Sequence, residues 1–259
     1  MTIIPAPRAD CTTAADGSIT FVVDDTRATA LVLQNRRTGE RLRLELAPHA
    51  VLATATGLAQ GRWDVLADCG DDGEQSVESG IRDLRTLLDR VPEPPAAAVA
   101  VRIPYQAKGG ALAVRSWLRA PHAEVGEIGF VQGAMTVEGR LYGAGLGPGA
   151  VVEARLRGTP GEVHREPVTG ESGAFAFTLP YAPLAAAGIV KETFRDLWLL
   201  PSGEGGGAVR IARILDDIAD RKGIYVYPAR PADAQGRATA VPYYTVENDL
   251  SVRLDPVAG

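Results

Sequence analysis

The stretch at residues 241–254, VPYYTVENDLSVRL, decides the fold predicted for this chain, because residues 101–117, VRIPYQAKGGALAVRSW, repeat its skeleton. In both stretches a Pro-Tyr pair is followed, after six residues, by Leu-x-Val-Arg. The pair is Pro104-Tyr105 in the first copy and Pro242-Tyr243 in the second, an offset of about 138 residues, close to the usual length of one domain. The repeat predicts two related domains in tandem.

Other correspondences between the halves support an internal duplication. The spacing Arg-x-x-Arg-x-x-x-Asp occurs at residues 82–89 and again at residues 210–217. The short apolar segments that contain Asp64 and Asp196 also align when these two aspartates are matched. Features that both halves share are more naturally determinants of the fold than parts of a specific site.

The boundary between the two domains is predicted at residues 119–127, RAPHAEVGE. This stretch is polar, contains proline and lacks the alternation of a strand, as linkers do. The predicted domains are therefore residues 1–120 and residues 121–259.

Alternation of apolar and polar residues recurs in short runs through both halves, for example at residues 18–23 and 150–157. This period of two is typical of strands that bury one face. Gly39 marks a hairpin, because glycine takes the positive φ that a tight turn needs. About seven short strands per half, separated by turns, predict an all-β protein of two immunoglobulin-like β-sandwiches.

The run at residues 209–227, VRIARILDDIADRKGIYVY, is ambiguous in secondary structure. Some of its apolar residues have helical spacing, but its place in the repeat favours a strand followed by a turn. We interpret the end of the run, with Tyr225 and Tyr227, as a strand beside residues 241–254. Alternate side chains of both strands would then share one face.

Composition excludes several classes of protein. The chain has 259 residues, of which 46% are hydrophobic and 23% charged, as is usual for globular proteins. A formal net charge of -5 without a dense Lys/Arg block argues against nucleic acid or an anionic membrane surface as the partner. Neither a secretory leader nor a membrane-spanning run is recognisable, so a cytoplasmic protein without membrane insertion is expected.

No metal or cofactor is expected. Cys11 and Cys69 lie far apart and outside any CxxC pattern, and the three histidines do not cluster in the sequence. The glycine-rich stretches at residues 143–149 and 202–207 lack the features of phosphate-binding loops and are predicted to be hairpin loops. A nucleophilic triad is disfavoured because no histidine has a recognisable partner.

Residues 210–230 and 241–254 together resemble the β-rich carboxy-terminal region of actinobacterial glycosyltransferases and CDP-glycerol-type glycerophosphotransferases, which make teichoic-acid-like surface polymers. The resemblance covers essentially the whole chain, because residues 31–40 and 61–66 are similar to the first of two such domains. The residues that carry this resemblance are Arg210, Arg213, Leu215, Asp216, Tyr225, Tyr227, Pro242, Tyr243, Thr245, Asn248, Leu250, Ser251 and Arg253. The nucleotide-binding transferase portion is absent from these 259 residues, so the resemblance implies a relative of an accessory module and no inherited transferase activity.

The candidate ligand-binding residues are polar and aromatic groups near the end of the second half. They are Arg210, Arg213, Asp217, Lys222, Tyr225, Tyr227, Tyr244 and Asn248. Tyrosine rings can stack on a sugar, while charged groups and amides bind hydroxyls or phosphates. The alternative interpretation stays open: the tyrosines fill the edge of a core, and Arg-Asp pairs hold strand ends together.

Three functional hypotheses follow, and the sequence leaves open whether the protein is an enzyme. The first is a non-catalytic accessory module of a cell-surface polymer or glycosylation pathway that binds a glycan, a polyol-phosphate chain or a glycosyltransferase. The second is an enzyme of specialised metabolism or of glycosyl or alditol-phosphate transfer, with an active site between the domains. The third is a structural module that forms a homodimer through exposed strand edges.

Overall fold

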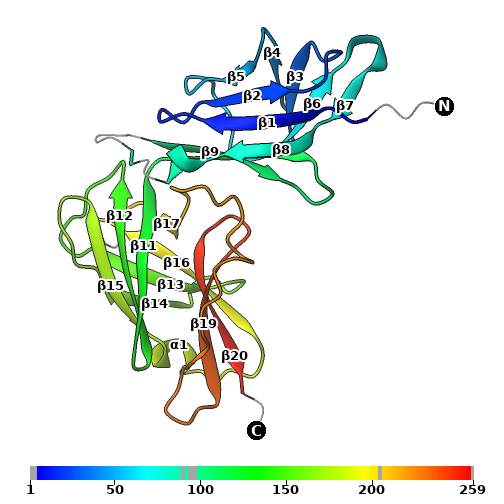
Figure 1. Ribbon diagram of the computed structural model, residues 1–259. Helices are drawn as coiled ribbons and strands as arrows, with labels where there is room; N and C mark the ends of the chain where they lie inside the picture. Colours follow the sequence, from blue (N-terminus) through cyan, green and yellow to red (C-terminus); the bar gives the residue numbers. More distant parts are fainter. Residues whose placement is uncertain (1–4, 89–90, 93–97, 204–205, 258–259) are drawn as a thin grey trace. The chain divides into compact units, whose positions relative to one another are not determined.

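The computed structural model describes residues 5–88, 91–92, 98–203 and 206–257, and this part of the chain is all-β, as predicted (Figure 1). Its strands form three sheets. The helical elements in the described residues are the short helix α1 (Ala182–Ala185) and two 3₁₀ turns, η1 (Gly70–Asp72) and η2 (Arg85–Leu87). No helix among these residues is long and apolar enough to cross a membrane.

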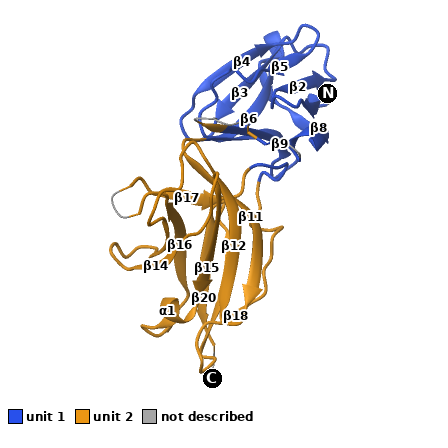
Figure 2. Cartoon of the chain, turned by 90° about the vertical axis from the view of Figure 1, so that its left-hand side faces the viewer, with its two compact units in different colours: residues 1–91, 100–118, 215–219 blue, residues 92–99, 119–214, 220–259 orange. Residues whose placement is uncertain are grey.

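The chain divides into two compact units, coloured separately in Figure 2. Unit 1 comprises residues 1–91, 100–118 and 215–219, and unit 2 comprises residues 92–99, 119–214 and 220–259. Each unit has a buried hydrophobic core of its own.

Unit 1 contains two sheets whose apolar faces supply one core. Its strands are β1 (Arg8–Thr13), β2 (Ile19–Val23), β3 (Ala30–Asn35), β4 (Arg41–Glu45), β5 (Ala50–Leu52), β6 (Gly61–Asp68), β7 (Glu74–Ser76), β8 (Glu78–Asp83), β9 (Val99–Gln106) and β10 (Leu112–Arg119). The first sheet has the order β5-β2-β1-β8 and the second the order β4-β3-β6-β10-β9, with β7 beside β6. On β6, Trp63, Val65 and Ala67 are buried at every second position, so the core accounts for the alternation in the sequence.

Unit 2 is built on one ten-stranded sheet. Its strands are β11 (His122–Val131), β12 (Ala134–Tyr142), β13 (Val151–Leu156), β14 (Val163–Pro167), β15 (Ala174–Pro180), β16 (Thr193–Leu200), β17 (Val209–Ala212), β18 (Arg230–Pro231), β19 (Ala238–Tyr244) and β20 (Leu250–Pro256). The path β15-β12-β11-β17-β16-β20-β19-β18 is continuous because β17 pairs with β11 on one side and with β16 on the other.

Both units follow the same order of strand pairing. The order β4-β3-β6-β10-β9 of unit 1 recurs as β14-β13-β16-β20-β19 in unit 2, and the parallel pair β1–β8 recurs as β11–β17. The register agrees as well. Ala113, which follows the leucine of the first repeat, pairs with Asp64, and Ser251, which follows the leucine of the second, pairs with Asp196.

Two local predictions need correction. The linker expected at residues 119–127 is largely strand, because β10 runs to Arg119 and β11 begins at His122, whose side chain is buried. The strand expected at the end of residues 209–227 is absent, since β17 ends at Ala212 and the chain up to β18 forms bends and turns. The expectation of a strand followed by a turn holds for the start of this run.

Candidate functional site

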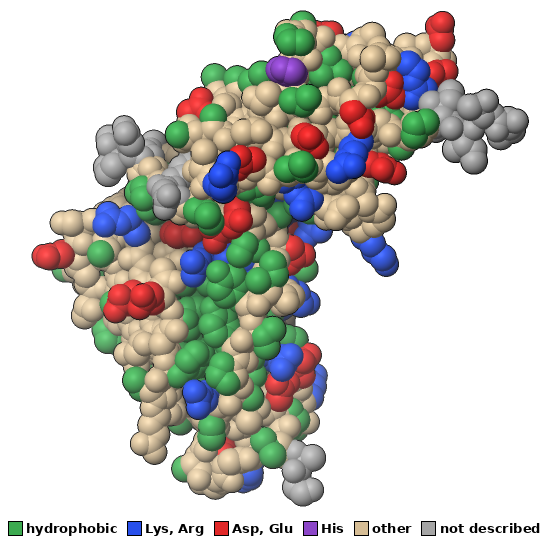
Figure 3. Space-filling view, in the orientation of Figure 1, with side chains coloured by type: hydrophobic (Ala, Val, Ile, Leu, Met, Phe, Trp, Pro, Cys, Tyr) green, Lys and Arg blue, Asp and Glu red, His purple; other side chains and the backbone are tan. Residues whose placement is uncertain are grey.

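A groove of about 590 Å³ lies on the outward side of the β13-β16-β20-β19 part of the unit 2 sheet. We call it the tyrosine groove, and it is lined by Arg157, Glu192, Phe194, Lys222, Tyr225, Val226, Tyr227, Ala229, Val241, Pro242, Tyr243, Thr245, Val246 and Arg253. Figure 3 shows hydrophobic side chains gathered on the face of unit 2 that carries β19, with basic side chains around them. The groove therefore combines apolar surface with positive charge.

Two aromatic rings form the floor of the tyrosine groove. Phe194 on β16 and Tyr243 on β19 occupy partly exposed positions in strands whose alternate positions, Arg195 and Tyr244 among them, are buried, so their side chains point away from the core. Their ring centroids are 5.8 Å apart, with an edge-to-face interplanar angle of 64°. Rings held in this way present apolar surface on which the C–H face of a sugar or polyol can rest.

Residues 222–229 form one wall of the groove, because here the chain leaves the edge of the sheet. β18 pairs with β19 only through Arg230 and Pro231, and both Pro228 and Pro231 lack the N–H that a ladder would need. The gap beside Val241 is therefore not filled by another strand of the described chain.

The side chains of this wall divide between the core and solvent. Tyr225 and Tyr227 pack against the buried Tyr244, with centroid separations of 5.7 and 6.4 Å. Val226, between them, is 83% exposed, and its side chain lines the groove. Burial raises the pKa of the Tyr227 and Tyr244 hydroxyls, so both stay protonated at neutral pH. The wall is thus fixed by its tyrosines and leaves an apolar edge open to a ligand.

Three cations surround the floor. Arg157, just after β13, donates from Nε and Nη2 to Asp196, at 3.1 and 2.5 Å, and its guanidinium lies 4.9 Å from the centre of the Phe194 ring. Arg253 donates to Asp255 at 2.8 Å. Lys222 is exposed and has no acidic partner among the residues the structure describes. The arrangement favours an uncharged or anionic ligand over a cation.

Asp196 holds this charge arrangement together. It accepts hydrogen bonds from Arg157, from Arg210 Nη2 at 2.9 Å and from the Ser251 hydroxyl at 2.8 Å. Burial by itself would raise the pKa of Asp196, but the hydrogen bond from Arg157 and the charge of Arg210 outweigh it and hold the pKa below its usual range. The carboxylate is therefore ionised at neutral pH and fixes both guanidinium groups.

Arg210 and Asn248 lie beneath the groove and act on the scaffold. Arg210 donates to the carbonyl oxygens of Leu197 and Leu250, at 2.5 and 2.9 Å, and so connects β16 with β20. Asn248 is fully buried in the turn between β19 and β20, with a positive φ of 59°. Its side-chain oxygen accepts a hydrogen bond from the backbone N–H of Arg221 at 3.1 Å, which anchors the start of the groove wall.

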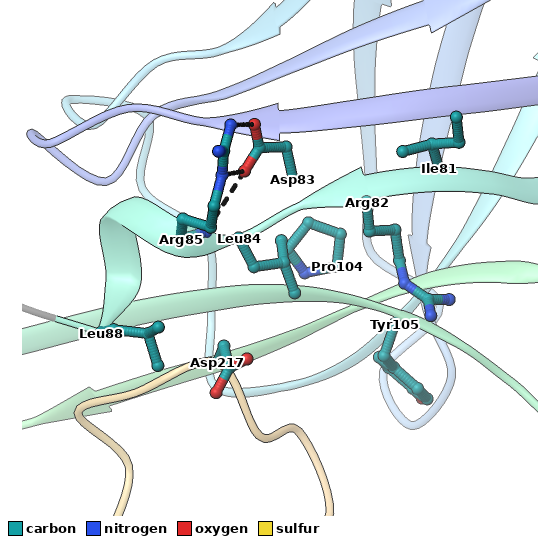
Figure 4. A pocket seen from close by; sticks show the side chains of 9 residues that line it. All are labelled: Ile81, Arg82, Asp83, Leu84, Arg85, Leu88, Pro104, Tyr105 and Asp217. Atoms are coloured by element: carbon teal, nitrogen blue, oxygen red, sulfur yellow. Dashed lines mark hydrogen bonds and ion pairs between the residues drawn. The ribbon is translucent and has the colours of Figure 1, made fainter.

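The structure distributes the eight sequence-predicted residues over three places. Lys222, Tyr225 and Tyr227 line the tyrosine groove. Arg210, Arg213, Tyr244 and Asn248 lie behind it: Tyr244 is fully buried, and Arg213 places its guanidinium 5.5 Å from the centre of the Tyr225 ring. Asp217 belongs to unit 1 and lines a different pocket (Figure 4).

That second pocket has a volume of about 570 Å³, and three of its charged or polar lining residues, Arg82, Asp83 and Arg85, already have partners. Asp83 and Arg85 form a two-point ion pair, at 2.8 and 2.6 Å, that Figure 4 shows away from Asp217. Arg82 donates to the Ser79 hydroxyl at 2.9 Å. Ile81 and Leu88 are 69% and 56% exposed, so the pocket is shallow. The tyrosine groove is therefore the better candidate site.

The candidate set left out most of the groove: Arg157, Glu192 and Phe194 were not singled out in the sequence, whereas Tyr243 and Arg253 were noted only as parts of the repeat and of the resemblance. One signal could have found Phe194. In residues 194–198, FRDLW, two aromatic residues share the side of the strand that carries Asp196, and the other side of the strand is buried. Aromatic residues at the exposed positions of a half-buried strand indicate a binding surface more often than buried ones do.

Groups for covalent or metal chemistry are poorly placed. Burial raises the pKa of Cys11 to about 12, which leaves it an unreactive thiol. His122 is fully buried, and its Nε2 lies 2.7 Å from Glu124. Among the described residues, no group of three or more His, Cys, Asp or Glu side chains could hold a metal ion. Neither Cys11 nor His122 lines the tyrosine groove.

Comparison with known proteins finds distant structural similarity and no family. No protein-family model matches the chain, and no curated protein matches it. The chain is similar to the crystal structure of TarS from S. aureus, with 12% identity and a TM-score of 0.41 over 66% of this chain and 30% of that one. It is also similar to a pullulanase from Anoxybacillus sp. LM18-11 complexed with maltotriose, with 12% identity and a TM-score of 0.22 over 74% and 24%. The chain thus spans less than a third of either protein, and we transfer no residue role from them.

Proposed function

We propose that the protein is a non-catalytic binding module of a glycan or surface-polymer pathway, and that unit 2 binds a carbohydrate or polyol-phosphate chain in the tyrosine groove. One observation carries the proposal: the partly exposed rings of Phe194 and Tyr243 form an aromatic floor that is surrounded by Arg157, Arg253 and Lys222. The volume of about 590 Å³ is within the range of small-ligand sites.

The chemistry of such a ligand matches what the groove supplies. A sugar or polyol has an apolar C–H face for the aromatic floor and hydroxyls for polar groups at the rim. A phosphate would accept hydrogen bonds from the exposed Lys222 and from Arg157, whose side chain is 43% exposed while it is bonded to Asp196. Catalysis needs a positioned acid or base. Glu192 is the carboxylate that lines the groove, and its Oε2 lies 3.8 Å from Nε of Arg253, so the two side chains form an ion pair.

We also propose that the two units are immunoglobulin-like sandwiches that arose by duplication. The shared strand order and the matching registers at Asp64 and Asp196 support this. On this view unit 1 keeps the scaffold, and unit 2 adds the ligand site through residues 222–229.

The test is calorimetric titration of the whole chain with hexameric glycerol phosphate and with neutral maltohexaose. Replacing Tyr243→Ala removes half of the aromatic floor, and replacing Lys222→Ala removes an exposed cation. We expect the first change to weaken binding at least tenfold, which is about 1.4 kcal/mol, and the second to weaken only the phosphate ligand.

Lys108→Ala is the matched control, because Lys108 is an exposed lysine of unit 1 that lies outside every groove described above. It should leave both affinities unchanged. If neither ligand binds the wild-type chain, or if Tyr243→Ala binds as the wild type does, the proposed function is wrong. A melting temperature for each variant separates lost binding from lost folding.

A further inference from the structure

A second groove lies next to the tyrosine groove in unit 2. It has a volume of about 600 Å³ and is formed by the turn between β11 and β12 together with the chain around β18. We call it the Phe130 groove. Its lining includes Phe130, Val131, Arg230 and Asp233, and the Arg230 guanidinium lies 5.5 Å from the centre of the Phe130 ring.

The two grooves share a thin wall. Tyr227 lines the tyrosine groove, Phe130 lines the second one, and their ring centroids are 5.9 Å apart. The boundary between the two grooves also falls between consecutive residues, because Ala229 lines the tyrosine groove and Arg230 lines the Phe130 groove. The two grooves are therefore adjacent, separated by the Tyr227 and Phe130 rings.

Free positive charge occurs in both grooves. Arg230 has no acidic partner among the described residues and is exposed, as is Lys222 in the first groove. The carboxylate of the second groove, Asp233, already accepts a hydrogen bond from the backbone N–H of Arg237 at 2.9 Å. On a chain with a formal net charge of -5, Arg230 above the Phe130 ring and the exposed Lys222 in the adjoining groove favour an anionic ligand.

We propose that the tyrosine groove and the Phe130 groove are consecutive subsites for one oligomeric ligand, in which hydroxyl-bearing units alternate with anionic groups. This inference rests on the proposed function and extends it. A short ligand fills the tyrosine groove alone, while a longer one crosses the Tyr227–Phe130 wall and places an anionic group on Arg230. Affinity then rises with chain length, since the second contact forms within an already bound ligand.

The test is titration of the whole chain with glycerol phosphate oligomers of increasing length, from the monomer to the octamer. The affinity of the wild type should rise at least tenfold with length and then level off. Arg230→Ala, and Val131→Glu at a position that is 51% exposed, should remove this rise and leave the affinity for the shortest binding oligomer unchanged. Lys108→Ala should follow the wild type at every length.

The outcomes separate this inference from the proposed function. If Tyr243→Ala abolishes binding but Arg230→Ala and Val131→Glu keep the full rise with length, the second subsite is wrong and the first stands. If affinity does not depend on length, the inference also fails. If maltohexaose binds as tightly as hexameric glycerol phosphate, the anionic character is wrong. If Tyr243→Ala changes nothing, both proposals fail.

Discussion

At the scale of single residues, Asp196 links the fold of unit 2 to its groove. It is bonded to Arg157 at the groove and to Arg210, which is only 14% exposed. Asp196→Asn removes one of two carboxylates beside the Arg210 charge, the other being Asp249 at 3.6 Å, and it weakens a charged hydrogen bond, so we expect the free energy of unfolding to fall by roughly 2 kcal/mol. Denaturation in urea, followed by tryptophan fluorescence, measures this loss.

Unit 1 offers a matched control at the equivalent register. Asp64 pairs with Arg36 at 2.6 Å, but both side chains are about two-fifths exposed, at 40% and 39%. Asp64→Asn should therefore lower the free energy of unfolding by less than about 1 kcal/mol. Equal losses in the two variants would show that burial of Arg210 is not what makes Asp196 important.

The depressed pKa of Asp196 predicts a particular dependence on pH. Because its folded-state pKa lies below the unfolded value of about 3.9, the carboxylate stabilises the fold fully above that value and loses this effect as the pH falls through the folded pKa. The gap in urea midpoint between the wild type and Asp196→Asn should be constant from about pH 6 to 8 and should narrow below about pH 4. A gap that persists in acid would mean that ionisation of Asp196 is not its cause.

At the scale of elements, close contact between strands sets the tolerance of unit 2 to change. Gly139 on β12 faces the Glu124 carbonyl of β11 and the Phe175 ring of β15, and a Cβ added there would collide with both. Gly139→Ala should lower the free energy of unfolding by at least about 2 kcal/mol. Urea denaturation checks this, with Gly145→Ala as the control, since that position is exposed and has open space around it. Equal stability of the two variants would contradict the packing described for β11, β12 and β15.

The strands of this fold could be predicted from the sequence, whereas the groove wall could not. Alternation marks β6 and β19 because each buries one face, and Gly39, with a positive φ of 73°, marks the β3–β4 turn. Tyr225 and Tyr227 also alternate, but prolines prevent a ladder there, and the two rings pack on Tyr244 from an irregular segment. Alternation reports which side chains are buried, and it does not report which backbone groups are paired.

Phe194 and Arg157 were missed for a related reason. A site formed by residues from β16, β19 and the chain after β13 becomes visible only when strand order brings them together. Arg210 and Asn248 were predicted to contact the ligand because they are polar and close in sequence to the tyrosines. In the structure both make hydrogen bonds within the scaffold. Residue type alone does not separate these two roles.

At the scale of the whole molecule, the two units share a scaffold but differ where the groove lies. In unit 1, Arg36 follows β3 and pairs with Asp64 on β6. In unit 2, Arg157 follows β13 and pairs with Asp196 on β16, the equivalent strand. Arg62 pairs with Arg115 in unit 1, and Phe194 pairs with Arg253 in unit 2. Arg62 therefore occupies the position that Phe194 has in unit 2. The segment before β9, residues 84–98, has no aromatic residue, whereas residues 213–237 contain two. We therefore expect ligand binding in unit 2 alone.

Hydrogen–deuterium exchange of the whole chain, with and without hexameric glycerol phosphate, tests this central claim most directly. The account predicts slower exchange in peptides that cover residues 222–233 and 241–246, and unchanged exchange in peptides of unit 1. Protection confined to unit 1, or binding without protection at either of these two segments, would contradict a ligand site in the tyrosine groove.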